Sequence, residues 1–499
     1  MDVLQSLEYG FSVALTGANL TYCFLGVLIG TLVGVLPGLG PAATISLLLS
    51  GTFHLNATSA IIMLAGVYYG AMYGGSTTSI LVNIPGEAAS VVTCLDGYRM
   101  AQQGRGGPAL GIAAFGSFIA GTIAVLGLAV AAPPLAKFAV GFGPPEYFSL
   151  IFLAFSLVTF LASGSILKAI MMIALGVFLG SVGTDFITGD SRFTYGSLTL
   201  SDGIGLVPVV MGLFGIAEVL ENIEKEDEKG RVLEAKFKNL LPTLHDWKES
   251  LGPIFRGTIL GFFLGLLPGG GSIIASFASY AVEKRISRQP ERFGRGAIQG
   301  VAGPESANNS AATSNFVPLM TLGIPANVVM ALVLGALMIH GVRPGPFLMK
   351  ENPGLFWGVI TSMYVGNIML LILNLPLIGL WVRILAIPYR VLFPLILLFC
   401  LIGVFSLNSN IWEIIIMTIF GIVGYLLRKL RYEAAPLIFA LVLSPILENS
   451  LRQALLMAEG SFEIFFIRPI SAILLIAGII LFIMPVLPRF KRVKLSDKF

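Results

Sequence analysis

Short polar side chains gather in two runs of an otherwise apolar sequence, Ser76–Ser79 and Asn308–Asn315, and each run leads into an Ile-Pro pair. Hydroxyl and amide groups donate hydrogen bonds to anions, whereas their oxygens and carbonyl groups freed by proline can coordinate Na⁺. Glu87 and Glu305 lie beside the runs and are candidate cation ligands or proton carriers. The predicted substrate ligands in the runs are Ser76, Thr77, Thr78, Ser79, Asn308, Asn309, Ser310 and Thr313. The predicted cation ligands are Asn83, Pro85, Glu87, Glu305, Asn315 and Pro325.

A Leu-Pro-Gly-x-Gly sequence occurs twice, at residues 36–40 and 267–271. In each copy we expect a helix to begin directly after the glycines, at Pro41 or Ser272. The free N–H groups and positive dipole end of such a helix bind carboxylate or phosphate without a buried Lys or Arg. Glycine also lets a ligand approach the backbone closely. The predicted substrate ligands here are Gly38, Leu39, Gly40, Thr44, Gly269, Gly270, Gly271, Ser272 and Ser276.

Purely structural roles compete with ligand binding at several positions. The GxxxG pairs at Gly30–Gly34 and Gly261–Gly265 are more often close helix packing, and the polar runs are also explained by hydrogen bonds between helices. Glu87 is followed closely by Asp96 and Arg99, which fits a position near a membrane surface. Proline with clustered glycine has little use in packing at mid-membrane, so the two glycine tips favour ligand contact.

The elements that position these residues are predicted to be membrane helices. Of the 499 residues, 56% are apolar and only 12% are charged, and no Asp, Glu, Lys or Arg occurs between Tyr9 and Gly86. Soluble domains are about one quarter charged, and a chain of this length has room for roughly ten apolar helical crossings. A net charge of +4 argues against a nucleic-acid binder, and the isolated three Cys and three His exclude a disulfide framework and a zinc site. The N-terminus lacks a basic residue, which argues against a cleaved signal peptide.

Four landmarks recur in the same order and indicate a duplication. The pattern GxxxGxLPGxG begins at Gly30 and again at Gly261, an offset of 231 residues. The polar runs, the Ile-Pro pairs and the sequences at Asp96-Gly-Tyr-Arg99 and His340-Gly-Val-Arg343 follow in both halves. Two homologous repeats are therefore predicted.

Basic residues indicate that the repeats are inverted in the membrane. Residues 283–295 carry five Lys or Arg, whereas the equivalent residues 51–58 carry none, and residues 427–432 are more basic than 181–202. Lys and Arg concentrate in cytoplasmic loops, so equivalent loops are expected on opposite sides. Only 26 residues separate Arg256 from Glu283, so two arms of about 12 residues, roughly 18 Å each, are expected to form a re-entrant hairpin.

The predicted fold is an all-α polytopic membrane protein with two inverted repeats, each holding a re-entrant hairpin and a helix broken at its polar run. About 11 crossings plus two hairpins are expected. The broken segments are 59–95 and 296–338. The predicted domains are residues 1–220 (surface helix, outer hairpin and five crossings), 221–255 (charged cytoplasmic linker), 256–450 (inverted repeat) and 451–499 (final span and basic cytoplasmic tail). Leu233, Phe237, Leu240 and Leu241 predict an amphipathic helix in the linker, either solvated or resting on lipid headgroups.

The motifs resemble those of the TctA family, the large membrane subunit of tripartite tricarboxylate transporters. The residues that carry the resemblance are Leu36–Thr44, Tyr73–Ser79, Asn83–Gly86, Asp96–Tyr98 and Gly303–Asn309. It implies a multi-pass subunit of the bacterial inner membrane. The distribution of basic residues, with four Lys or Arg at residues 489–494, predicts a cytoplasmic C-terminus and a periplasmic N-terminus. The resemblance also implies two partners, a small four-helix membrane subunit (TctB-like) and a periplasmic solute-binding protein (TctC-like). Ser306 stands where the family pattern leads us to expect Ala, a small departure.

The resemblance implies uptake of organic anions such as citrate, coupled to a cation gradient. Na⁺ is the expected coupling ion, with H⁺ as the alternative, and no further cofactor is expected. The chain has no Walker A sequence, so ATP is not expected to drive uptake. An intramembrane enzyme is disfavoured because no His lies near the polar runs, and a passive channel is disfavoured by the inverted repeat.

Overall fold

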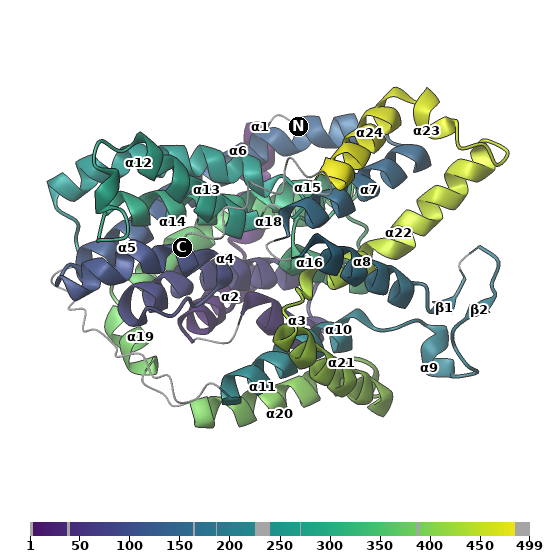
Figure 1. The fold of residues 1–499 in the computed structure, drawn as a ribbon, viewed down its shortest axis with the longest axis horizontal. Coiled ribbons are helices and arrows are strands. Elements are labelled where there is room, and N and C mark those ends of the chain that lie inside the picture. The colour runs from purple at the N-terminus through teal and green to yellow at the C-terminus, as the bar shows by residue number, and fades with distance from the viewer. Residues whose placement is uncertain are drawn as a thin grey trace. The chain divides into compact units, whose positions relative to one another are not determined.

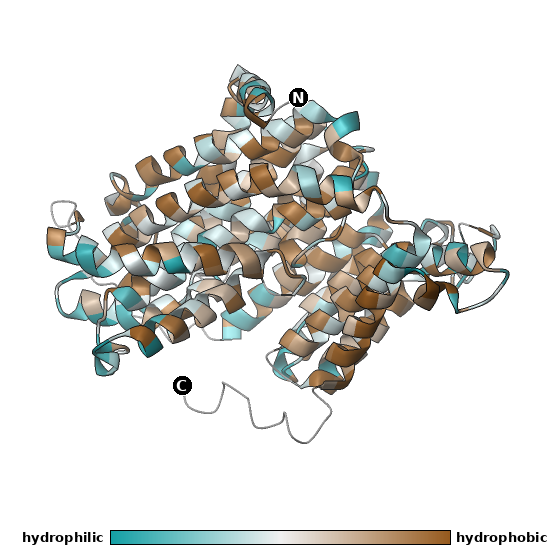
Figure 2. Cartoon of the chain, turned by 90° about the horizontal axis from the view of Figure 1, so that it is seen from above, coloured by the Kyte–Doolittle hydropathy of each residue, from teal (hydrophilic) through white to brown (hydrophobic). Residues whose placement is uncertain are grey.

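The computed structural model describes residues 3–36, 40–162, 165–185, 187–224, 240–269, 271–385 and 389–484. Most of them are helical (Figure 1), which confirms the all-α prediction. Apolar residues run along the helices, and hydrophilic residues collect near helix ends and connections (Figure 2). Among the described residues, seven helices are long and apolar enough to cross a membrane: Gly17–Val35, Gly106–Ala139, Pro144–Leu161, Leu206–Glu224, Pro353–Asn374, Ile411–Lys429 and Ala435–Met457. The chain is thus a multi-pass membrane protein, while the finer count of about 11 crossings stays a prediction.

Two compact units divide the chain, and each is built from segments distant in sequence. The first comprises Met1–Lys137, Val207–Leu266 and Gly270–Tyr425, and the second comprises Phe138–Leu206, Leu267–Gly269 and Leu426–Phe499. These units follow packing and not sequence order, so the predicted domain boundaries stay predictions.

The helices of the first unit begin with an N-terminal set. They are α1 (Val3–Ala14), α2 (Gly17–Val35), α3 (Pro41–Thr52), α4 (Ala57–Val82), η1 (Ala88–Ser90), α5 (Val91–Gln102), α6 (Gly106–Ala139), α10 (Leu206–Val210), η2 (Met211–Ile216) and α11 (Ala217–Glu224). The rest are α12 (Leu244–Gly265), α13 (Gly271–Ile286), η4 (Pro290–Arg292), α14 (Gln299–Ser314), α15 (Phe316–Leu322), α16 (Val328–Ile339), α17 (Leu348–Glu351), α18 (Pro353–Asn374), α19 (Ile378–Ile384), α20 (Tyr389–Asn408) and α21 (Ile411–Lys429). The unit boundaries fall just inside the ends of α6, α10 and α21.

The described residues of the second unit form six helices and one short β-hairpin. Its elements are α7 (Pro144–Leu161), α8 (Ile166–Gly180), β1 (Gly183–Thr184), β2 (Ser191–Arg192), α9 (Leu198–Ser201), α22 (Ala435–Met457), α23 (Ile464–Ile467) and α24 (Pro469–Ile483). Two ion pairs join the antiparallel β1–β2 hairpin to α22. Arg452 contacts Asp185 at 2.8 Å, and Arg192 contacts Glu448 at 2.7 Å. Backbone N–H groups of Thr188 and Ile187, and then Arg452, lower the pKa of Asp185 to about 2.

Two helix pairs in the first unit pack backbone against backbone. A Cβ atom added to Gly26, Gly30 or Gly34 of α2 would overlap the carbonyl oxygens of Met63, Val67 and Ala71 on α4. Gly257, Gly261 and Gly265 of α12 face Gly303, Ala307 and Ala311 of α14 in the same way. Such close approach requires small residues, so packing is the role of both GxxxG pairs.

In the first half the helix break lies after the polar run and not within it, which corrects the prediction. In the second half α14 ends at Ser314 and α15 begins at Phe316, so the helix is interrupted at Asn315, the last residue of the run. Helix α4 continues through Ser76–Ser79, and its C-cap Asn83 is left-handed, with φ of 62°. In the other half, α15 ends at Gly323, with φ of 72°. Proline follows each cap by two residues and cannot continue a helix, whereas a hydroxyl group within a run can bond back to a carbonyl one turn earlier, as Thr313 does to Asn309.

The first arms of the two predicted hairpins are longer than expected. Helix α12 begins at Leu244, because Thr243 and Asp246 form a reciprocal capping box, and not near Arg256. Its 22 residues span about 33 Å, and the 19 residues of α2 span about 28 Å. The following arms are short, with 12 residues in α3 and 16 in α13. Re-entry of these shorter arms stays a prediction.

Part of the charged linker and the basic tail lies outside the described residues. This includes Leu233 and Phe237 of the predicted amphipathic helix, as well as the tail after Met484. Leu240 is described and is buried against Gly111 of α6, whereas Leu241 is exposed. Neither Leu240 nor Leu241 lies in a helix, so the predicted amphipathic helix does not extend to them, and its earlier part stays a prediction.

Asp96 ties α5 to the segment that precedes α14. Its carboxylate is buried and accepts hydrogen bonds from the Tyr280 hydroxyl at 2.9 Å and from the backbone N–H groups of Gly294, Gly296 and Ala297 at 2.8–2.9 Å. One side chain thus satisfies four donors contributed by distant parts of the sequence.

We expect Asp96→Ala to lower the free energy of unfolding by about 3 kcal/mol, because three backbone N–H groups lose their acceptor. Thermal unfolding of the detergent-purified protein measures the change. The exposed Asp202→Ala is the matched control and should melt like the parent. Equal melting of both variants would show that water replaces the carboxylate at no cost.

Candidate functional site

Two buried carboxylates occupy the first unit close to the helix breaks. Glu305 lies in the middle of α14 with no exposed surface, and Glu87 is the N-cap of η1 and is 8% exposed. A carboxylate removed from water is costly unless hydrogen bonds or a cation compensate it. The partners of each acid therefore indicate what the site is built to hold.

Glu305 is held by hydroxyl groups from two other helices. Ser76 of α4 donates to one carboxylate oxygen at 2.5 Å, and Thr93 of α5 donates to the other. Ser76 comes from the first polar run, which is thus joined to the acid beside the second. Both donors are neutral, so the negative charge of an ionised Glu305 stays uncompensated.

Glu87 has neutral partners as well. The Ala89 backbone N–H donates to it at 2.7 Å as a helix cap, and the Asn308 amide donates at 3.2 Å. The Oδ1 oxygen of Asn308 is buried and has no hydrogen-bond partner. A carboxylate beside an unused amide oxygen is a set of hard ligands of the kind that hold Na⁺.

No counter-charge reaches either acid within the part of the chain that the structure describes. The described ion pairs join other acids, such as Glu283 to Arg256 and Asp246 to Arg105. The described residues also contain no cluster of three or more His, Cys, Asp or Glu side chains fit for a metal. Glu87, Glu305, Asn308, Ser76 and Thr93 are called the acid cluster below.

A second buried cluster is neutral and centres on a tyrosine. The Tyr68 hydroxyl on α4 accepts hydrogen bonds from the amides of Asn315 and Asn327, both at 2.9 Å, and lies 3.4 Å from the Ser272 hydroxyl. Ser272 stands in the first turn of α13, where backbone N–H groups are free of helical partners. The Oδ1 oxygen of Asn315 is buried and unpartnered. Tyr68, Ser272, Asn315 and Asn327 are called the tyrosine cluster.

Several predicted ligands use their polar groups in hydrogen bonds within or between helices. Thr78 bonds to the Val35 carbonyl of α2, Ser310 to the Thr258 carbonyl of α12, and Ser276 to the Pro304 carbonyl. Four further predicted ligands are bonded as follows: Thr44 to Gly40, Ser79 to Ser90, Asn309 to Ser117 and the Glu305 carbonyl, and Thr313 to Asn309. Thr77 is buried within α4. Hydrogen bonding between and within helices thus accounts for much of the polar runs.

The glycine tips differ in what a side chain would meet. Gly38, Leu39 and Gly270 lie outside the described residues. Gly269 has φ of 77°, and a Cβ there would lie 3.0 Å from the Val158 backbone, whereas a Cβ on Gly40 would meet no atom of a described residue within 4 Å. Gly271 has φ of 50° and faces Asn327 at 3.8 Å. Only Gly40 among the described tip glycines therefore offers unstrained open space at a helix start.

The remaining predicted cation ligands lie in the helix breaks. Asn83 is exposed and caps α4, Pro85 is half-buried, and Pro325 is buried. Hydrogen bonds of Asn83 to the acid cluster do not occur within the described residues. Its assignment as a cation ligand stays a prediction.

Sequence reasoning missed Tyr68, Thr93 and Asn327. One signal was present for Asn327: it follows Ile-Pro-Ala as Glu87 follows Ile-Pro-Gly, so the duplication already aligns the two. Both residues prove to be N-caps whose side chains accept a backbone N–H. Tyr68 and Thr93 stand alone in apolar surroundings and carried no local signal.

The comparisons with known proteins agree with this architecture. The family model described as "Tripartite tricarboxylate transporter TctA family" matches residues 20–439, and this is a family of transporters. A protein of Agrobacterium vitis described as "Uncharacterized 52.8 kDa protein in TAR-I ttuC' 3'region" is 52% identical and covers 98% of both chains. A second from that organism, "Uncharacterized protein in TAR-II ttuC' 3'region", is 52% identical over 46% of this chain and 96% of its own length. No solved structure matches the chain. With most of its length matched by the family model, the chain belongs to the TctA family of tripartite tricarboxylate transporters.

Proposed function

We propose that this protein carries organic anions with two or three carboxylates, such as citrate, into bacteria across the inner membrane by cation-coupled uptake. The N-terminus is periplasmic and the C-terminus cytoplasmic. A TctC-like periplasmic binding protein delivers the substrate, and a TctB-like four-helix subunit completes the membrane complex. Family membership supports the substrate class and the partners.

The single observation that supports coupling of uptake to a cation is that the buried acids of the acid cluster have no positively charged partner among the described residues. Two carboxylates with neutral donors bind a cation favourably, because the cation removes the cost of their uncompensated charge. Oxygen ligands from carboxylate and amide suit Na⁺, which is the coupling ion we favour. Protonation also neutralises a buried carboxylate, so H⁺ is the second candidate.

The tyrosine cluster is the part of the site suited to the anion. It offers hydroxyl and amide groups beside the free N–H groups at the start of α13. The dipole of this 16-residue helix adds positive potential at the same point. An anion held here and a cation held at the acid cluster compensate each other's charge during transport.

Matched contacts support the duplication from which such a site derives. Glu87 contacts Asn308, and Asn327 contacts Tyr68. At a constant offset of 240 residues Glu87 is equivalent to Asn327 and Tyr68 to Asn308, so the two contacts are equivalent. The caps Asn83 and Gly323 share this offset. Contacts that interchange between halves are expected of a pseudo-two-fold axis, the arrangement of transporters with inverted repeats.

Proteoliposomes that contain this chain and the small membrane subunit test the proposal. Labelled citrate is presented on the loaded binding protein under an inward Na⁺ gradient, an inward H⁺ gradient, or neither. We expect accumulation with the Na⁺ gradient and none without the binding protein. Accumulation with H⁺ alone would make H⁺ the coupling ion.

Uptake that persists after every ion gradient is collapsed would refute coupling. A passive channel would instead give a current that follows the substrate gradient alone in electrical recordings. These outcomes separate the transporter from a pore.

A further inference from the structure

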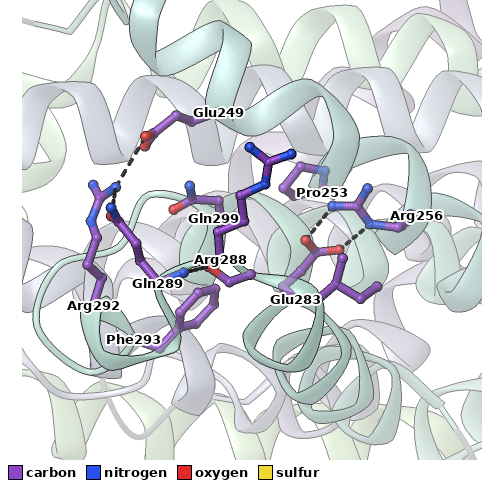
Figure 3. Close-up of a pocket in the computed structure, with 11 residues that line it drawn as sticks. Glu249, Pro253, Arg256, Glu283, Arg288, Gln289, Arg292, Phe293 and Gln299 are labelled. Carbon is purple, nitrogen blue, oxygen red and sulfur yellow. Dashed lines mark hydrogen bonds and ion pairs between the residues drawn. The ribbon is translucent and has the colours of Figure 1, made fainter.

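A charged cavity of about 360 Å³ lies at the junction of α12, α13 and α14, apart from the acid and tyrosine clusters. This volume falls in the range of about 300–1,000 Å³ typical of small-molecule sites. Figure 3 shows arginine and glutamate side chains converging on it from three segments. The transport site described above makes no use of these residues.

The two acids of the cavity are already neutralised by two of its arginines. Arg256 holds Glu283 with two hydrogen bonds of 2.8 and 2.6 Å, and Glu283 is only 3% exposed. Arg292 contacts Glu249 at 3.2 Å. The third arginine, Arg288, therefore decides the charge of the cavity.

Arg288 forms no hydrogen bond or ion pair with any residue that the structure describes. Its side chain extends between Gln299 and Pro253 (Figure 3), and the Gln299 amide is likewise free of bonds within the described ranges. A guanidinium group presents parallel N–H donors that match the oxygens of a phosphate group. With three arginines and two glutamates, the cavity keeps one positive charge for an anion.

An exposed apolar stripe runs along α12, and its members Ile259 and Phe263 lie three and seven residues after the cavity residue Arg256, on the same helix face. Leu251, Phe255, Ile259 and Phe263 follow one another at intervals of four residues, and each is at least 42% exposed. Ile286, which lines the cavity, is 56% exposed. Side chains four apart share one helix face, so an occupant anchored by its phosphate has an apolar surface on which its chains can lie.

We infer that this cavity binds the phosphate headgroup of an anionic membrane lipid, with the acyl chains along the α12 stripe. Basic pockets between membrane helices on the cytoplasmic side are the usual setting for such lipids. The basic segment 283–295 that lines the cavity places it on that side under the charge rule applied to the sequence. The shared chemistry is a phosphate group, and a free phosphate is the competing source.

Native mass spectrometry of the detergent-purified protein tests the inference with phosphatidylglycerol, phosphatidylcholine of the same chains, and inorganic phosphate. We expect phosphatidylglycerol to stay bound to the protein, and phosphatidylcholine and inorganic phosphate to bind more weakly. Arg288→Ala should weaken its binding about fivefold, the contribution of one basic residue near a headgroup. Arg285→Ala, an exposed neighbour that does not line the cavity, is the matched control and should bind like the parent.

Phe255→Gln separates the two sources of phosphate. It should weaken phosphatidylglycerol binding and leave binding of inorganic phosphate unchanged. The inference is overturned if Arg288→Ala binds like the parent, or if Arg285→Ala loses as much, since the attraction would then be diffuse surface charge. Tighter binding of inorganic phosphate than of the lipid would overturn the lipid as the occupant.

Discussion

Glu305→Gln is expected to lower gradient-driven citrate accumulation by about 10- to 100-fold, the effect of losing hydrogen bonds to a charged group worth about 1.5–3 kcal/mol. The amide keeps the shape of the side chain, but it removes the negative charge that Ser76 and Thr93 surround. Initial rates of uptake in proteoliposomes measure the change. Glu291→Gln, an exposed residue of η4, is the matched control and should transport like the parent.

The same variant distinguishes the two candidate ions. A glutamine resembles a permanently protonated glutamate, so under H⁺ coupling it should lose accumulation but keep exchange of internal for external citrate. Under Na⁺ coupling both activities should fall, because a cation ligand is lost. Accumulation that remains at the parental level would remove Glu305 from the coupling site.

Gly40→Val is expected to reduce uptake to the background of empty liposomes while the protein still inserts and folds. Gly40 precedes α3, its carbonyl accepts the N–H of Thr44, and a Cβ there meets no atom within 4 Å among the residues that the structure describes. The added side chain would therefore occupy space at the start of α3, where the sequence predicts a second contact with the anion. Uptake assays at matched protein content, together with thermal melting, measure both effects.

Gly51→Val is the matched control for this substitution. Gly51 lies in the last turn of the same helix, and a Cβ there also meets nothing within 4 Å. Parental uptake by Gly40→Val would show that the first tip does not contact substrate. Gly269 is less suited to this test, because its φ of 77° and the adjacent Val158 backbone make any side chain there a test of folding.

Patterns of composition and close spacing predicted the parts of the fold that depend on local physics. Apolar length predicted membrane helices, and the GxxxG pairs predicted close packing, which the glycine–carbonyl contacts of α2 and α12 confirm. The proximity of Glu305 to a polar run was visible in the sequence. Its actual partners, Ser76 and Thr93, are 229 and 212 residues away, and no local pattern reports such contacts.

The errors have equally specific causes. The first polar run is predicted to break its helix, but α4 continues through it and ends at the left-handed cap Asn83, two residues before Pro85. The first arm of the second hairpin is predicted to start near Arg256, but the Thr243–Asp246 capping box starts this helix at Leu244. Hydropathy treats Tyr68 as an ordinary large side chain and does not reveal its role as a hydrogen-bond centre.

The backbone contact between α2 and α4 has a mechanical consequence. Glycines seated against a row of carbonyl oxygens leave no gap for sliding or rotation, so each helix pair is expected to move as one stiff body. Any motion that opens the site alternately to the two sides must then be absorbed where the backbone is irregular. Among the described residues, the short joints after Asn83 and Gly323 are two such places. Each lies four residues before Glu87 or Asn327, which the proposed function places at the cation and the anion.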